Sequence, residues 1–198
     1  MSSAVALPRR TSYLTDRWSS SAAGTVALVV GFAALTALCA QISFRPSGWV
    51  VPITGQTFAV LLTGAALGSL RGIASMTLYA LAGIVGLPVF AHGAHGWSQL
   101  AGATGGYIVG FIVAAGVVGW AAERGWDRTP LKAWPLFLLG EVIIFGIGVP
   151  WLKFDLNTTW AWAIHWGFAV FIPGEIVKAF LAGVTLPAAW RLRRRLEG

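Results

Sequence analysis

The feature that most constrains this chain is a long interval without charge. From Ile73 to Ala122 the sequence contains no Asp, Glu, Lys or Arg. A soluble domain carries about a quarter charged residues to cover its surface, whereas this chain of 198 residues is 11% charged and 57% hydrophobic. The interval is long enough for two apolar helices of about 20 residues each. These properties exclude a water-soluble globular protein and predict an integral membrane protein.

Charges and glycine-rich stretches divide the whole chain into apolar segments. We predict six membrane-spanning helices, at about residues 22–43, 56–70, 73–90, 105–122, 134–152 and from near Pro173 onward. Helices are favoured over barrel strands because the segments are continuously apolar for about 18 residues and do not alternate. The predicted fold class is an all-α integral membrane protein, with a membrane domain over 22–190 between an N-terminal tail (1–21) and a basic C-terminal tail (191–198).

The basic residues are divided unequally between the two faces of this predicted topology. The face with both termini collects eleven of them: Arg9, Arg10, Arg17, Arg71, Arg124, Arg128, Lys132, Arg191, Arg193, Arg194 and Arg195. The other face has Arg45 and Lys153. Positive charge marks the cytoplasmic side, so both termini are predicted to be cytoplasmic, in a bacterial inner membrane. Nucleic-acid binding is disfavoured, because the basic residues flank apolar segments and form no soluble basic face.

Three ionisable residues remain at membrane depth, namely Glu141, Glu175 and Lys178. Such residues usually pair or face a cavity, because a charge inside the bilayer is costly. Glu175 and Lys178 are three residues apart and therefore share one face of a helix, and Pro173-Gly174 suits the start of that helix. The pair is either a structural ion pair or a binding clamp. Glu141 is either a proton-titrating group or, as we favour, an acid that reaches the cytoplasmic interface.

Four segments of the chain resemble one known family. They are VPITGQTFAVLLTGAALGSLRG (51–72), LYALAGIVGLPVFAHGAHG (78–96), GATGGYIVGF (102–111) and FIPGEIVKA (171–179). In this order they resemble the BioY family, the biotin-binding membrane subunits of energy-coupling-factor (ECF) transporters. The similarity extends from about Leu35 to Ala189.

The resemblance implies a six-helix substrate-specificity (S) component. Such a subunit captures biotin from outside and delivers it inward with a separate transmembrane coupling subunit and two ATP-binding cassette ATPases. In the family, the acid and the lysine of the last-helix motif help to bind the biotin head group, which implies this role for Glu175 and Lys178. The acid is Glu here, where Asp is usual.

Other positions depart from the family pattern. Ala94 stands where members can carry an Asn, and Ile108 where they can carry an Arg after the tyrosine of TGGY, which is Tyr107 here. His95 and Gln99 could replace these polar contacts. Biotin needs acceptors for its ureido N–H groups, a cation for its carbonyl or carboxylate, and aromatic walls. The predicted ligand-binding residues are Glu175, Lys178, Tyr107, Gln56, Trp97 and His95.

Several alternatives stay open at this point. The ligand is biotin, or else a related vitamin or a biotin precursor, and a proton-coupled secondary carrier is a second class of mechanism. Lys178 could contact either the ureido oxygen or the tail carboxylate. Ala33 and Ala37 resemble the alanine motif of the first helix that meets the coupling subunit, although packing within the protein explains them equally well.

An enzyme and a metalloprotein are both disfavoured. The sequence has no Gly-x-Ser-x-Gly elbow and no P-loop, so ATP hydrolysis is expected on partner chains. His92 and His95 lie in a glycine-rich loop with no acid nearby, which is a weak metal signal. We therefore expect no catalytic residue, no metal and no cofactor, and the lipid bilayer as the surroundings.

Overall fold

The structure is a computed structural model, which describes residues 14–15 and 21–197. The predicted tail of residues 1–21 thus lies almost wholly outside the described residues. The helices and strands are, in chain order, α1 (Ala22–Gln41), β1 (Ser43–Phe44), β2 (Ile53–Thr54), α2 (Gln56–Leu67), α3 (Ser69–Ile84), η1 (Ala91–Gly93), α4 (Trp97–Ala101), α5 (Gly105–Glu123), α6 (Pro130–Asp155), α7 (Trp160–Gly167), η2 (Ala169–Phe171) and α8 (Ile172–Glu197).

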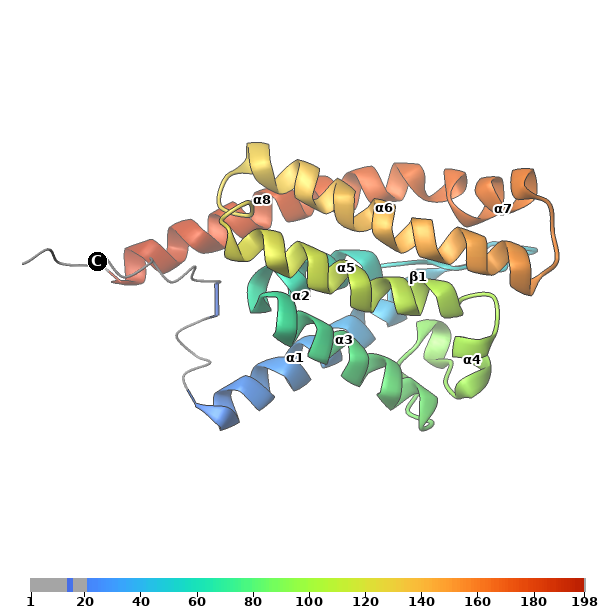
Figure 1. The fold of residues 1–198 in the computed structure, drawn as a ribbon, viewed down its shortest axis with the longest axis horizontal. Coiled ribbons are helices and arrows are strands. Elements are labelled where there is room, and N and C mark those ends of the chain that lie inside the picture. The colour runs from blue at the N-terminus through green and yellow to red at the C-terminus, as the bar shows by residue number, and fades with distance from the viewer. Residues whose placement is uncertain (1–13, 16–20, 198) are drawn as a thin grey trace, which may run out of the picture.

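The long helices form a bundle around α5. Figure 1 shows α5 and α6 side by side along the long axis, with α8 beside α6 and with α1 and α3 on the opposite side. α5 packs against α2, α3 and α6 and is the most buried of the four helical segments that are long enough to cross a membrane, among the described residues. The α5–α6 connection and the C-terminal part of α8 lie at the same end of the bundle (Figure 1).

Glycines allow the central helices to approach closely. A Cβ added at Gly64 of α2 would lie 2.5 Å from the carbonyl oxygen of Ala115 on α5. A Cβ added at Gly119 of α5 would lie 2.4 Å from the carbonyl carbon of Gly68. Small residues permit such backbone contacts in membrane helix packing. The close contact between α2 and α5 therefore depends on the absence of a side chain at Gly64.

Four helical segments are long and apolar enough to cross a membrane, by length and composition. These are Ala22–Gln41, Gly105–Glu123, Pro130–Asp155 and Trp160–Leu192 among the described residues. α2 has 12 residues and α3 has 16, fewer than the about 20 residues that a helix needs to span the hydrocarbon core. The predicted number of six spans therefore depends on these two short helices.

The connections contain structure that the sequence patterns did not predict. β1 and β2 form a small antiparallel hairpin, with Ser43 opposite Thr54. The short helices α4 and α7 lie between the predicted spans, in segments where the sequence patterns indicated no helix. α3 ends at Ile84 instead of about residue 90, because Gly86 takes a φ of +109° and the Gly96 N–H closes the loop on the Gly83 carbonyl at 2.7 Å.

The last helix begins where the sequence predicted it, one residue before Pro173. It continues through the predicted tail to Glu197 without a break.

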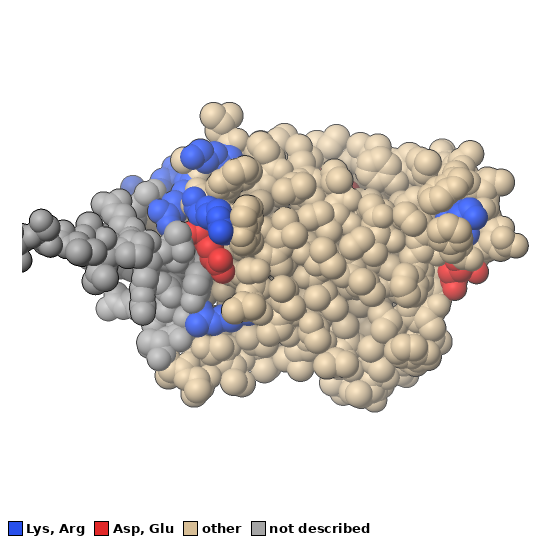
Figure 2. Space-filling view, in the orientation of Figure 1, with Lys and Arg blue, Asp and Glu red and all other residues tan. Residues whose placement is uncertain are grey.

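The surface of the molecule is apolar between two charged ends. Figure 2 shows charged side chains gathered at the two ends of the long axis, with an almost entirely uncharged band between them. Large apolar side chains face outward along this band, for example Leu38 (68% exposed), Val142 (66%) and Phe180 (54%). Water would disfavour an apolar surface of this extent, whereas lipid tails accommodate it. The chain is a multi-pass membrane protein.

Candidate ligand-binding site

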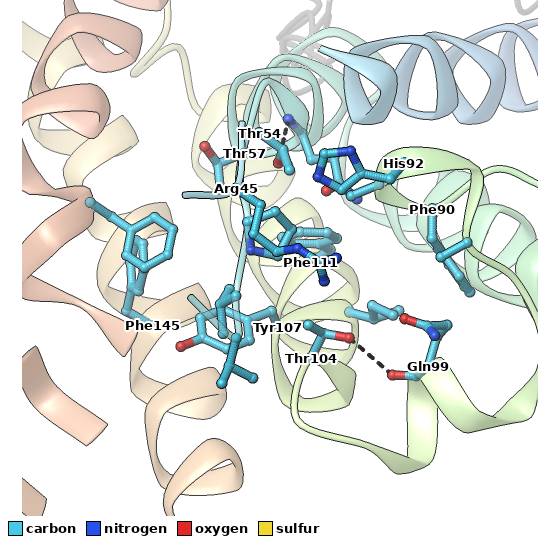
Figure 3. Close-up of a pocket in the computed structure, with 18 of the residues that line it drawn as sticks. Arg45, Thr54, Thr57, Phe90, His92, Gln99, Thr104, Tyr107, Phe111 and Phe145 are labelled. Carbon is cyan, nitrogen blue, oxygen red and sulfur yellow. Dashed lines mark hydrogen bonds between the residues drawn. The ribbon is translucent and has the colours of Figure 1, made fainter. Parts of the chain in front are cut away.

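A cavity of about 390 Å³ opens at one end of the bundle. Its walls come from the N-terminal ends of α2, α5 and α8, the middle of α6, the β1–β2 hairpin segment and the loop that follows α3. Figure 3 shows Arg45, Tyr107, Phe111 and Phe145 around this space, with His92 and Gln99 at one side. Ligand pockets in proteins are typically about 300–1,000 Å³ and combine apolar walls with a few polar groups, and this cavity has both properties.

The polar floor of the cavity is a cluster of three side chains from two helices. Lys178 Nζ donates to Glu175 Oε1 at 2.7 Å and to Thr57 Oγ1 at 3.0 Å. The Thr57 hydroxyl donates to Glu175 Oε2 at 2.8 Å. Glu175 is 8% exposed and Thr57 7%. The two predicted residues are therefore brought together as expected, and Thr57 is a third member that the sequence patterns did not single out.

Two helix starts place this cluster inside the molecule. Ile172 and Pro173 open α8, and Glu175 lies in its first turn, where the positive end of the helix dipole favours a carboxylate. α2 begins at Gln56, whose backbone N–H donates to the Thr54 hydroxyl at 3.2 Å. Thr57 is the next residue, so the first turns of both helices face the cavity. A helix can begin at membrane depth when its start lines a pocket.

Gln56 lines the cavity as predicted, but its amide is already engaged. Its Nε2 donates to the Tyr79 hydroxyl at 2.7 Å, and that hydroxyl donates to the Val89 carbonyl at 3.2 Å. Tyr79 is 1% exposed. This chain of hydrogen bonds ties α2 and α3 to the loop after α3. Tyr79 is the one aromatic residue of α3, which is the local signal that distinguishes it.

Tyr107 supplies an aromatic wall. Its ring lies edge-on to Phe145, with ring centroids 5.9 Å apart, and Phe145 in turn packs against Phe171. The Tyr107 hydroxyl donates to the Gly167 carbonyl at 2.8 Å and so joins α5 to α7. The Tyr107 hydroxyl is therefore occupied by a hydrogen bond within the protein, and the ring of Tyr107 lines the cavity.

The opposite wall contains polar residues, of which the sequence indicated only Gln99 as a ligand contact. Arg45, which served only to predict topology, lines the cavity, and so do His92 and Gln99. His92 Nδ1 lies 3.2 Å from the Ser43 hydroxyl. Ala94 and Ile108, the two positions that depart from the family pattern, line the same cavity. The Arg45 side chain is exposed, and its place in the wall of the cavity, which no sequence spacing indicated, is what distinguishes it.

Two predicted site residues lie away from the cavity lining. Trp97 is 64% exposed, and the His95 side chain has its Nδ1 3.2 Å from the Gly93 carbonyl. The positive φ angles of His92 and Gly93 turn the loop, so His92 and not His95 faces inward.

Glu141 lies elsewhere than we expected. It is 5% exposed on α6, so it does not reach the cytoplasmic interface, and Glu175 and Lys178 act electrostatically on its carboxyl group. The sequence interpretation treated Glu141 as an isolated acid. The packing of α6 against α8 brings it to the cluster instead.

The two alanines predicted for docking face the interior of this chain. Ala33 is 7% exposed and belongs to the hydrophobic core, and Ala37 is partly buried against the same core. The small residues that α1 exposes are Ala22 and Ala23 at its start and then Ala27, Gly31 and Ala34.

Known proteins match this chain in sequence and in fold. The profile of the BioY family matches residues 11–195. The biotin transporter BioY of Rhodobacter capsulatus is 36% identical over 170 residues, which cover 80% of this chain and 89% of the relative. The biotin transporter BioY of Thermotoga maritima is 38% identical over 155 residues, which cover 77% and 88%.

A solved structure has a similar fold. The crystal structure of the S-component for biotin from an ECF-type ABC transporter matches with a TM-score of 0.78 and 25% identity, over 87% of this chain and 92% of that one. The family profile covers most of the chain, and the relatives exceed 30% identity over most of their own length. This chain therefore belongs to the BioY family.

Proposed function

We propose that this chain is the S component of an ECF-type importer and that it binds biotin in the cavity beside Glu175 and Lys178. Family membership and the fold shared with the S component for biotin support this assignment. The observation that carries the site is the cluster of Glu175, Lys178 and Thr57 on the floor of an otherwise aromatic cavity. The chain itself binds and does not catalyse a reaction.

The cavity offers a partner for each part of biotin. The ureido group has two N–H donors and a carbonyl acceptor, which suit the Glu175 carboxylate and the remaining N–H of Lys178. The rings of Tyr107, Phe111 and Phe145 would cover the apolar bicycle. We place the tail carboxylate near Arg45, because a guanidinium binds a carboxylate in a planar, bidentate manner. Lys178 then contacts the ureido oxygen and not the tail.

The predicted contacts fall into two groups in this proposal. Glu175, Lys178, Tyr107 and Gln56 belong to the cavity wall, with Gln56 acting through Tyr79. Trp97 and His95 belong to the rim outside the lining, and His92 and Gln99 take the polar role that was expected of that loop.

We propose that the protein spans a bacterial inner membrane six times, with both termini in the cytoplasm. The helices are α1, α2, α3, α5, α6 and α8. Because α2 and α3 are short, the bilayer must be thin around them, or neighbouring segments must shield their ends from the lipid. The charge-rich end of the bundle, with Arg124 and Arg128 in the α5–α6 connection, supports the assignment of that end to the cytoplasm. The segment 1–21 and the end of α8 beyond residue 190 then lie in the cytoplasm.

The partners of an S component are a transmembrane coupling subunit and two ATPases. We propose that α1 is the docking helix and that its outward small residues Ala27, Gly31 and Ala34 form the contact, while Ala33 and Ala37 support α1 from inside. Ala34→Trp should prevent co-purification with the coupling subunit and leave biotin binding intact. Val142→Trp, on the exposed face of α6, is the matched control.

Direct binding to the purified protein in detergent tests the function. We expect biotin and desthiobiotin, which both carry the ureido group, to bind, and pimelate to bind weakly or not at all. Lys178→Ala should lower the affinity for biotin about 100-fold or more, because a buried charge pair loses one partner. Lys153→Ala is the matched control, since Lys153 stacks on Phe154 outside the cavity, at 4.3 Å from the ring centroid. Equal affinity in both lysine variants would refute the site, and tighter binding of desthiobiotin would favour a precursor as the substrate.

A further inference from the structure

Glu141 is a buried acid next to the proposed ligand site. Neither of its carboxyl oxygens has a hydrogen-bond partner among the described residues. Glu175, Lys178 and Thr57, the members of the polar cluster, are nevertheless close enough to act on its carboxyl group. An unpartnered buried carboxyl group is rare in proteins and calls for a physical explanation.

The charges of the cluster do not balance if every group is ionised. Two carboxylates, Glu141 and Glu175, would then face a single ammonium group, that of Lys178. Lys178 already donates to Glu175 and Thr57. An uncompensated negative charge in an apolar interior is strongly unfavourable, and two neighbouring carboxylates relieve their repulsion when they share a proton. One proton on Glu141 makes the cluster neutral.

We propose that Glu141 is a positioning residue of the ligand site, which holds a proton and donates a hydrogen bond to the Glu175 carboxylate. Glu175 would then receive hydrogen bonds from α2, α6 and α8 together, which fixes the direction of its remaining lone pairs toward the cavity. A neutral carboxylic acid in an apolar site can serve as a donor in this way. The effect of Glu141 on ligand affinity rests on the function proposed above. The protonation of Glu141 itself does not depend on that function.

The proposal has a definite pH dependence. The charged groups that act on Glu141 are Glu175 and Lys178 of α8, and α2 contributes the uncharged Thr57 hydroxyl. The single charged residue of α5 is Glu123, at the C-terminal end of that helix. When rising pH removes the Glu141 proton, the donor is lost and two carboxylates repel each other. Ligand affinity should therefore fall as the pH rises through the titration of Glu141.

Infrared spectroscopy of the unliganded protein tests the protonation directly. The wild-type protein near pH 7 should show the C=O band of a protonated carboxylic acid, and Glu141→Gln should reduce it. Glu123→Gln is the matched control, because Glu123 accepts a hydrogen bond from the Ser69 N–H at 2.8 Å far from the cluster. An unchanged band in Glu141→Gln would overturn the proposal, whether or not biotin binds.

Biotin titrations across pH 6–9 test the positioning role. Glu141→Gln keeps a donor that cannot lose its proton, so its affinity should stay near that of wild type at low pH and no longer fall with rising pH. Glu141→Leu lacks the donor and should bind about 10- to 100-fold more weakly at every pH. Wild-type affinity in Glu141→Leu, or a wild-type pH profile in Glu141→Gln, would contradict the role. A wild-type protein that binds no biotin at any pH would instead refute the proposed function.

Discussion

The two halves of the bundle use their interior space in opposite ways. In what we call the closed half, around the C-terminal part of α5, backbones touch at Gly64 and Gly119, and side chains such as Val118 and Leu136 are fully buried. In the pocket half, around the N-terminal part of α5, side chains from several elements surround a cavity of about 390 Å³. A membrane protein can thus be tightly packed at one end and hollow at the other, because helix starts and aromatic side chains surround the hollow end.

The comparison also concerns buried acids. Glu175 in the pocket half is surrounded by Thr57 and Lys178. Asp127, at the charged end of the bundle, is fully buried and accepts a hydrogen bond from Trp190. The first acid faces a cavity and can exchange partners with a ligand, whereas the second joins the α5–α6 connection to α8. Burial alone therefore does not distinguish a binding residue from a structural one. The presence of a cavity beside the side chain does.

The largest expected effect is in the pocket half. Thr57→Val keeps the shape of the side chain and removes its hydrogen bonds to both Glu175 and Lys178, so biotin affinity should fall about 100-fold. Thr63→Val is the control on the same helix, because the Thr63 hydroxyl donates only to the Ala59 carbonyl of α2 at 2.6 Å. Isothermal titration measures both affinities. Equal losses in both variants would mean that the cluster is not part of the site.

In the closed half, the expected effect is on stability and not on affinity. Gly64→Ala places a Cβ 2.5 Å from the Ala115 carbonyl oxygen, which forces α2 and α5 apart and should destabilise the protein by about 1–3 kcal/mol. Gly146→Ala has nothing within 4 Å of the added Cβ and should be neutral or slightly stabilising. Thermal unfolding in detergent distinguishes them. Equal midpoints would show that the closed half is not tightly packed.

Trp190→Phe should lower stability by about 1–3 kcal/mol, because the buried Asp127 carboxylate loses its hydrogen-bond donor. Burial raises the pKa of Asp127 above its usual value, and Trp190 opposes this shift. The folded state therefore binds the Asp127 proton more tightly than the unfolded state, so this residue's contribution to stability falls as the pH rises between the two pKa values. Asp127→Asn should remove that contribution. Unfolding midpoints of the three proteins at several pH values test it, and parallel curves would contradict the assignment.

The smallest effects are expected at the rim. His95→Ala and Trp97→Ala should change biotin affinity less than about threefold, because neither side chain lines the cavity. His92→Ala and Gln99→Ala, from the same loop, should weaken binding more strongly. A reversed order of the two pairs in the same titration would show that the loop rearranges when the ligand binds.

Much of this molecule was predictable from local patterns. The start of α8 near Pro173, the bounds of α5 and the start of α2 at Gln56 agree with the predicted spans, because proline, glycine and charge mark helix ends in lipid clearly. The pairing of Glu175 with Lys178 followed from their spacing of three residues on one helix. The resemblance to the BioY family was confirmed by comparison with known relatives.

The remainder required contacts between distant segments. Three residues come to the site from separate parts of the chain: Thr57 from α2, Arg45 from the segment after β1, and Glu141 from α6. Nothing in their local sequence indicates that they lie close to the same site. His95 and Trp97 were predicted from their place in a glycine-rich loop, but the positive φ angles of His92 and Gly93 decide which side chains face inward.

The sequence by itself determined three properties: the chain is a membrane protein, its helices begin at particular residues, and one acid and one lysine share a helix face. Those properties follow from apolar runs and short-range spacing, which the hydrocarbon solvent and helix geometry dictate. The tertiary structure alone decided where the interior contains a cavity, which charged side chains line it, and that Glu141 is buried. These depend on how helices far apart in the chain pack, because only packing sets which buried charges become neighbours.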